Sequence, residues 1–326
     1  HRQRRLGRTR YAQQHEVKIY FLPVLALTAA VLGSCSDWTD QKTVDIDPQH
    51  AKEQNPELWA RYMEALRTYR QSKHFVTYGS FDNSAEKSKN EGDYLRSLPD
   101  SLDIVTPTHP ESLTSYDCED ILLLQEKSIK VLYFVDYTAQ MPTLTDAGKL
   151  GAWLDKVVAA ASQLGMNGFA IKGTPLYGGT EAEQTARREA AKLIVSKLST
   201  AVGDGKLLVF EGDPAFMDAA DLNKLDYVVL NTATITSAVD LKLYVAGVIE
   251  NFSIPKEKLL LSAKINEKLV DEEGEKLDAV TEMTNRVVSL GPVGGLAIYA
   301  LGDDYYHTKM NYETSRLAIQ IMNPSK

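Results

Sequence analysis

The chain has 326 residues, with 36 lysine and arginine side chains against 44 aspartate and glutamate side chains, a formal net charge of −8. Six of those basic side chains and one of the acidic ones lie in residues 1–34, so the rest of the chain carries a net charge of −13. So acidic a body, with no basic stripe, repels phosphate backbones and excludes nucleic acid as an expected partner. The 44% hydrophobic and 25% charged content is typical of a packed globular protein.

Residues 1–35 are expected to be an N-terminal extension plus a lipoprotein signal peptide. Lys18 precedes an apolar run over residues 19–32 that is too short and too proline-interrupted to span a bilayer, which favours a secretory signal. The run ends in Leu-Gly-Ser-Cys, which resembles a bacterial lipobox whose cysteine, here Cys35, is acylated. We therefore expect lipidation at Cys35 and a place on the outer membrane, at the cell surface. An ordinary signal peptide with a coincidental cysteine is the alternative.

Residues 36–54 are polar and aperiodic, and they are expected to form a tether to a folded domain over residues 55–326. Asn55 and Pro56 begin that domain as a typical helix start, a capping residue followed by proline at the first helical position.

The folded domain alternates short apolar runs with helical patterns. The runs expected to be strands are 74–81, 102–107, 130–137, 167–174, 206–213, 226–233, 258–265 and 295–302. The clearest helical patterns are 146–164, 180–201, 237–252, 277–290 and 310–322, whereas the first crossover, 84–98, is expected to be short or irregular. Strands that are apolar throughout indicate a parallel sheet covered by helices. Eight such units in about 250 residues predict a single-domain α/β fold, a TIM (β/α)8 barrel.

A doubly wound open sheet is the alternative fold. It usually carries a glycine-rich, phosphate-binding first turn, which the sequence "YGSFDNS" (78–84) does not supply.

In a TIM barrel the functional side chains lie at the carboxyl ends of the strands. Aromatic and planar polar side chains at these ends suit a neutral polyol, because rings cover the apolar face of a sugar and polar groups bond its hydroxyls. The candidate ligand-binding residues are Tyr78, Asp136, Tyr137, Lys172, Glu211, Asn231 and Tyr299. The plainer alternative is that strand ends are polar in any barrel, because they meet loops and water.

The stretch "NGFAIKGT" (167–174) resembles the fourth-strand signature of glycoside hydrolase family 18, the chitinases and endo-β-N-acetylglucosaminidases, which has the pattern D-G-F-D-I-D-x-E. The matching positions are Gly168, Phe169 and Ile171. The family's three aspartates and its catalytic glutamate are replaced by Asn167, Ala170, Lys172 and Thr174. Strand alternation places positions 170, 172 and 174 on one face, the lumen of the expected barrel. Similarly, "GGLAIYAL" (294–301) resembles the family's eighth strand, with Tyr299 where a tryptophan usually lies under the sugar.

The resemblance implies a substrate-assisted mechanism, in which the glutamate is the general acid and the substrate's own N-acetyl group is the nucleophile. A threonine hydroxyl does not protonate a glycosidic oxygen near neutral pH, and Lys172 supplies a cation where that mechanism needs an anion. We therefore expect no catalytic residue at these positions and no cofactor.

The preferred hypothesis is a surface-anchored, catalytically inactive glycan-binding protein. Like the family-18-like lipoproteins of gut-bacterial glycan utilisation, it is expected to hold an oligosaccharide or N-glycan containing N-acetylglucosamine for an importer or a neighbouring glycosidase. An endo-acting hydrolase with relocated acids is the first alternative, and its candidate acids are Glu211, Asp213 and Asp136. We expect Glu211 or Asp136 rather to pair with Lys172, because a cation in a barrel lumen needs a partner. A protein-interaction scaffold is the second alternative.

No metal site is expected, because the six histidines lack the H-x-H and H-x-x-x-H spacings of zinc ligands. The acidic stretch "DEEGE" (271–275) lacks the alternating spacing of a calcium loop and is expected to be a solvated loop.

Overall fold

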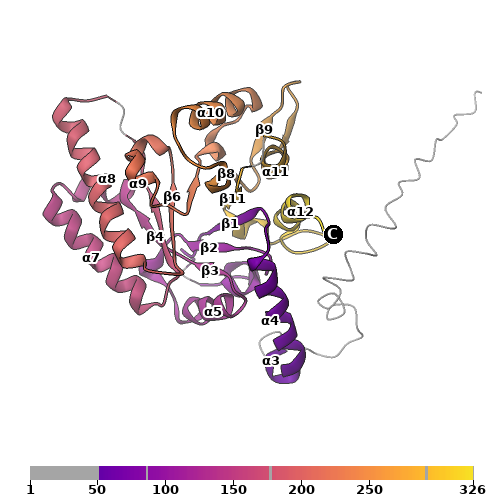
Figure 1. Cartoon of the computed structure of the whole chain (residues 1–326). Coiled ribbons are helices and arrows are strands. Elements are labelled where there is room, and N and C mark those ends of the chain that lie inside the picture. The colour runs from indigo at the N-terminus through magenta and orange to yellow at the C-terminus, as the bar shows by residue number, and fades with distance from the viewer. Residues whose placement is uncertain (1–50, 86, 176–177, 291–292, 326) are drawn as a thin grey trace, which may run out of the picture. The chain divides into compact units, whose positions relative to one another are not determined.

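The computed structural model describes residues 51–325, apart from positions 86, 176–177 and 291–292. Cys35, the predicted signal peptide and most of the predicted tether lie outside these residues. Residues Ala51–Pro324 form one compact unit (Figure 1).

Within the described residues, nine parallel strand segments form one sheet in the order β3-β2-β1-β11-β8-β7-β6-β5-β4. The bounds are β1 Val76–Phe81, β2 Ile104–Pro107, β3 Lys130–Val131, β4 Tyr133–Asp136, β5 Gly168–Lys172, β6 Leu207–Glu211, β7 Tyr227–Val229, β8 Leu259–Lys264 and β11 Gly295–Tyr299. The two end segments, β3 and β4, are separated only by Leu132 and are halves of one strand. Leu132 donates its N–H to Val105 of β2, and Asn167 donates to Val131 from the other side. The sheet therefore closes into an eight-stranded barrel, which confirms the predicted TIM barrel.

The barrel interior is filled by one or more side chains from every strand. The buried members of this cluster are Tyr78, Ile104, Leu132, Ala170, Val209, Val229, Leu260 and Ala297. Their neighbours along each strand, such as Phe169 and Ile171 on β5, belong instead to a second core between the barrel and the helices. This alternation is why the strands are apolar on both faces.

Helices surround the strands (Figure 1). Their bounds are α3 Ala51–Gln54, α4 Pro56–Gln71, α5 Ser115–Glu126, α6 Tyr137–Gln140, α7 Ala147–Gln163, α8 Glu181–Val202, α9 Ala219–Leu222, α10 Ala238–Asn251, α11 Ala279–Ser289 and α12 Glu313–Met322. Asn55 caps α4 by accepting a hydrogen bond from the N–H of Leu58, at the start that the sequence predicts. The short helix α3 occupies the last four residues of the segment predicted as a tether.

Two features go beyond the predicted pattern. A two-stranded hairpin, β9 (Lys268–Val270) and β10 (Lys276–Asp278), lies between β8 and α11, and the acidic stretch 271–275 forms its connection. The first crossover contains two short 3-10 turns, η2 (Glu91–Asp93) and η3 (Leu95–Ser97), in agreement with the expectation of an irregular segment.

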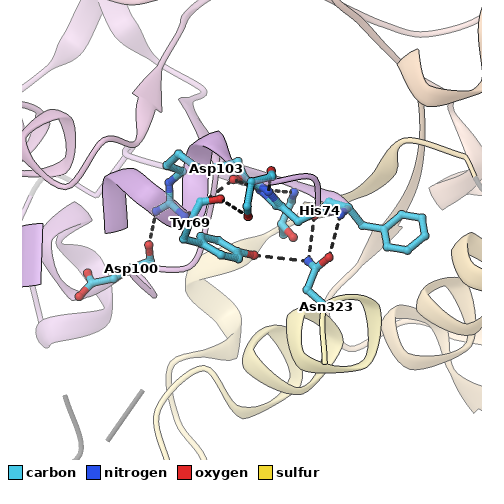
Figure 2. Close-up of polar contacts among 9 residues, drawn as sticks. Tyr69, His74, Asp100, Asp103 and Asn323 are labelled. Atoms are coloured by element: carbon cyan, nitrogen blue, oxygen red, sulfur yellow. Dashed lines mark hydrogen bonds and ion pairs between the residues drawn. The ribbon is translucent and has the colours of Figure 1, made fainter. Parts of the chain in front are cut away.

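A polar cluster ties α4 and the end of α12 to the amino ends of the strands, opposite the predicted functional edge (Figure 2). Asn323, just after α12, accepts a hydrogen bond from the N–H of Phe75 at 2.7 Å and donates to its carbonyl at 2.9 Å. The ring of Tyr69 on α4 stacks on His74 with centroids 4.4 Å apart. The cluster fastens the two terminal helices of the compact unit to the first strand.

His74 lies between two acceptors. Its Nε2 is 2.6 Å from Oδ1 of Asp103, and its Nδ1 is 2.7 Å from the carbonyl oxygen of Ser72. Neither partner is a donor, so both ring nitrogens carry a proton in this arrangement and the ring is an imidazolium. Burial alone lowers the pKa of His74, but the hydrogen bond and charge of Asp103 outweigh it, and the pKa lies above the ordinary 6.5.

We expect His74→Gln to destabilise the protein by about 1–2 kcal/mol at pH 5.5, the scale of a charge-assisted hydrogen bond, and by less above pH 8. The sign follows from the raised pKa, because the stabilisation is complete below the unfolded-state pKa and is lost as pH rises through the folded-state value. Urea unfolding of both proteins across this pH range measures the gap. His109→Gln is the matched control, since that side chain is 45% exposed. A gap that stays constant with pH would contradict the assignment of an imidazolium.

Candidate functional site

Three ionisable side chains lie next to one another at the carboxyl edge of β4, β5 and β6. Lys172 is in register with Asp136 on one side and with Glu211 on the other. Ala170, two residues earlier on β5, is fully buried in the interior cluster, so alternation directs Lys172 toward the barrel axis as well. A row of acid, base and acid therefore crosses three neighbouring strands at the mouth of the barrel.

Glu211 is held by two tyrosines from the other side of the barrel. The hydroxyl of Tyr78, on β1, donates to Glu211 Oε2 at 2.5 Å, and the hydroxyl of Tyr299, on β11, donates to Oε1 at 2.7 Å. In the strand order β1 lies four places from β6, directly across the lumen. Glu211 is 4% exposed and Tyr78 is fully buried. Both carboxylate oxygens are thus engaged out of contact with solvent.

The pKa values of Glu211, Tyr78 and Tyr299 follow from the burial of these side chains. Burial raises the pKa of Glu211 above its ordinary value, and the two tyrosine hydroxyls and the charge of Lys172 offset part of that shift. Burial and the neighbouring carboxylate raise the pKa of Tyr78 and of Tyr299 well above 10. The tyrosines therefore remain protonated donors across the physiological pH range.

The expected ion pair with Lys172 is not formed. No described carboxylate lies within 4.0 Å of the Lys172 ammonium, and this side chain is exposed. Glu211 is bonded by tyrosines instead, and Asp136 Oδ1 accepts a hydrogen bond at 3.0 Å from the N–H of Ala139, capping α6. The predicted pairing was wrong because tyrosine hydroxyls donate hydrogen bonds to Glu211 and a backbone N–H donates one to Asp136. Adjacency in the sheet alone did not reveal these donors.

Asn167 and Thr174, two other positions of the stretch 167–174, lie at opposite ends of β5. Asn167 lies at the amino end of β5, where its Oδ1 accepts from the N–H of Val131 at 2.8 Å and from Gln125 Nε2 at 2.9 Å. It joins neighbouring elements there and is remote from the carboxyl edge. Thr174 is exposed just beyond β5, with its hydroxyl oxygen 3.4 Å from that of Thr138. Of the four positions, only Lys172 and Thr174 therefore stand at the barrel mouth with solvent access.

The remaining candidates differ in access. Asp213 is half-buried and accepts a hydrogen bond from the N–H of Ala215, capping the turn η6 (Pro214–Phe216), and Asn231 is exposed. Tyr137 is 7% exposed, with its ring centroid 5.9 Å from that of Phe216 in the outer core. A ring buried in this way offers no open face to a sugar, and the same holds for Tyr78. Tyr299 is half-buried.

The structure adds an aromatic residue to the candidates. Tyr306 is 69% exposed and follows η9 (Leu301–Asp304), the turn after β11. Its ring packs edge-on against Tyr305 at 4.9 Å, and Tyr305 contacts the buried Tyr312 at 5.5 Å. Tyr306 is thus an open ring on a fixed support at the carboxyl edge. The sequence signal for it is "DDYYHT" (303–308), paired aromatics directly after the last strand.

Across the described part of the chain, no group of three or more histidine, cysteine, aspartate or glutamate side chains is placed to hold a metal ion. The same residues include no helix that is both long enough and apolar enough to cross a membrane.

The closed parallel barrel, with its polar row at the carboxyl edge, defines the chain as a TIM-barrel protein whose candidate site lies at the strand ends. The model of glycoside hydrolase family 18, BT1044-like, matches residues 39–149 and 145–321, and the chain belongs to this family. The predicted resemblance to glycoside hydrolase family 18 is thereby confirmed at the level of the family. No curated protein matches the sequence.

Solved structures share the fold at low sequence identity. BT1044, solved with selenomethionine and a glutamate-to-glutamine substitution, is 17% identical with a TM-score of 0.68, and the match covers 84% of this chain and 96% of that one. An endo-β-N-acetylglucosaminidase from Cordyceps militaris is 19% identical with a TM-score of 0.61, over 80% and 95% of the two chains. A chitinase from Bacteroides thetaiotaomicron is 10% identical with a TM-score of 0.54, over 77% and 97%.

We expect Tyr78→Phe to destabilise the protein by about 1–3 kcal/mol, because it leaves one oxygen of a buried carboxylate without a donor. The destabilisation should fall as pH is lowered and Glu211 is protonated, since its pKa is raised. Denaturant unfolding at pH 5 and pH 8 checks both effects. Tyr306→Phe removes the same hydroxyl group from an exposed ring and should change stability by less than about 0.5 kcal/mol. Equal stability of Tyr78→Phe and the unmodified protein would show that the bond is not stabilising.

Proposed function

We propose that the protein binds glycans at the mouth of its barrel and does not hydrolyse them. The ligand is an oligosaccharide or N-glycan containing N-acetylglucosamine. The exposed ring of Tyr306 and the half-buried ring of Tyr299 supply aromatic surface, and the polar ends of Lys172 and Asn231 contact hydroxyl or amide groups of the sugar.

The observation that carries this proposal is the state of Glu211. A general acid has to come within hydrogen-bonding reach of the glycosidic oxygen, at about 2.6–3.2 Å. Both oxygens of Glu211 already accept hydrogen bonds from tyrosines, and the residue is 4% exposed. The other two candidate acids, Asp136 and Asp213, each cap a turn or helix through a backbone N–H. Thr174 stands where the family signature has its glutamate, and its hydroxyl does not act as an acid near neutral pH.

The family relationship supports the choice of ligand. A variant of the Cordyceps militaris endo-β-N-acetylglucosaminidase was solved in complex with fucosyl-N-acetylglucosamine-Asn, and it is 19% identical to this chain with a TM-score of 0.57. A chitinase domain from Ostrinia furnacalis, 12% identical with a TM-score of 0.57, was solved with an N-acetylchitooligosaccharide. We infer that the ligand here contains the same sugar.

An endo-acting hydrolase that uses Glu211 as its acid is the second candidate function. The direction in which burial shifts the pKa of Glu211, upward, favours it, because a general acid has to carry a proton before it can donate one. It requires Tyr78 and Tyr299 to release the carboxyl group when substrate binds.

We further propose that Cys35 carries a lipid that anchors the protein to the outer membrane, where it presents glycans to an importer or to a neighbouring glycosidase. Expression with the signal segment in a Gram-negative host checks the anchor. The protein should sediment with membranes, whereas Cys35→Ser should appear in the soluble periplasmic fraction. Membrane association that survives this substitution would contradict lipidation at Cys35.

We expect the purified chain to retain N-acetylglucosamine-containing glycans intact. The measurement is overnight incubation with a panel of N-glycans and chitin oligosaccharides, followed by mass spectrometry of bound and free sugars. Thr174→Glu alone should not produce cleavage, and Tyr306→Ala should weaken retention several-fold, the scale of one aromatic contact. Shortened products that disappear in Glu211→Gln would instead establish the hydrolase. Retention of no glycan at all would reject the glycan-binding function.

A further inference from the structure

A pocket of about 260 Å³ opens beside the carboxyl end of β5. Its walls include Pro175 from the segment after β5, Phe216 from η6, and Gln184, Arg187 and Arg188 from α8. Its lining combines apolar residues with two arginines.

The pocket adjoins the candidate glycan site. Pro175 follows Thr174 directly in the chain, and Thr174 is exposed at the barrel mouth. A Cβ atom placed on Gly173 would lie 2.7 Å from the ring of Phe216, so this ring packs on the backbone between Lys172 and Thr174. A sugar seated at the end of β5 therefore has the pocket immediately beside it.

The positive charges of this region lack acidic partners within the part of the chain that the structure describes. Neither Arg187 nor Arg188 has a described carboxylate within 4.0 Å, although Arg187 donates one hydrogen bond to the carbonyl of Gly178 at 3.1 Å. Glu183, the nearest acid along α8 on the same side, accepts a bond from the N–H of Thr180 and caps the helix. Lys172, exposed at the end of β5, is a third cation with no described carboxylate within 4.0 Å, in a chain of net charge −8.

We propose that this pocket binds an anionic substituent, a carboxylate or a sulfate, on the glycan held at the barrel mouth. The inference rests on the proposed glycan-binding function and narrows its ligand to acidic glycans. A guanidinium presents paired N–H donors that match a carboxylate or sulfate in a two-pronged contact. Pro175, which is half-buried, and Ala215, which is exposed, provide apolar surface against which the carbon skeleton of the sugar packs.

The test compares three N-glycans with the same core, ending in galactose, in a sialic acid that bears a carboxylate, or in a sulfated galactose. Titration calorimetry at low salt gives the dissociation constant of each for the full chain. We expect at least one acidic glycan to bind about tenfold more tightly than the neutral one, the scale of a charge-assisted bond, and the preference to shrink at high salt. The two acidic glycans distinguish carboxylate from sulfate.

Substitutions of the pocket arginines test whether the preference for acidic over neutral glycans arises at this pocket. Arg188→Gln and the double change Arg187→Gln/Arg188→Gln should remove it while leaving affinity for the neutral glycan within about twofold, and Arg188→Lys should retain part of it. Lys192→Gln, on the same helix and paired with Asp218 outside the pocket, should leave the preference intact. Equal binding of neutral and acidic glycans, or a preference that survives the double change, would overturn this inference and leave glycan binding standing. Absence of binding to all three would overturn both proposals.

Discussion

A carboxylate inside a barrel has to receive hydrogen bonds, because burying an unpaired charge costs several kcal/mol. Glu211 meets this constraint by using two tyrosines that reach it from β1 and β11. The resulting bridge spans the lumen just above the apolar interior layer that contains Ala170 and Val209. The bridge links strands on opposite sides of the barrel and closes the upper end of the interior. The glycan of the proposed function therefore lies above the bridge, on the strand ends and loops.

The same bridge determines which partners remain for Lys172 at the barrel mouth. Because Glu211 receives hydroxyl donors, it makes no close ion pair with Lys172, although the two residues are in register and the charge of Lys172 lowers the pKa of Glu211. Asp136 is likewise engaged by the N-terminus of α6. Lys172 thus keeps its charge exposed next to a pocket with two further cations, Arg187 and Arg188. The pocket itself is lined by two arginines and no acidic side chain among the described residues, in a protein whose overall charge is negative, which supports the proposed anionic substituent.

The sequence predicted the elements well, because apolar runs and helical periodicity report directly on burial. All eight strand runs became strands, and the inward position of Ala170 followed from alternation. The bridge was beyond prediction, because Tyr78 and Glu211 lie on opposite strands and their contact depends on register and side-chain reach across the lumen. Tyr137 illustrates a second limit. It follows β4 directly, but α6 begins at that residue and its ring packs against Phe216 in the outer core.

The two changes at the end of β5 act in the same direction. In the proposed function, Thr174 stands in place of the proton donor of the family signature, and Lys172 places a cation two residues earlier, about 7 Å along an extended chain. A cation at such a distance stabilises the ionised form of any carboxyl group nearby and so lowers its pKa. An acid restored at position 174 would therefore lie beside a charge that holds it ionised and opposes proton donation. In the proposed function, Lys172 and the arginines attract an anionic glycan, so the residues at the end of β5 that oppose hydrolysis also favour retention of an intact ligand.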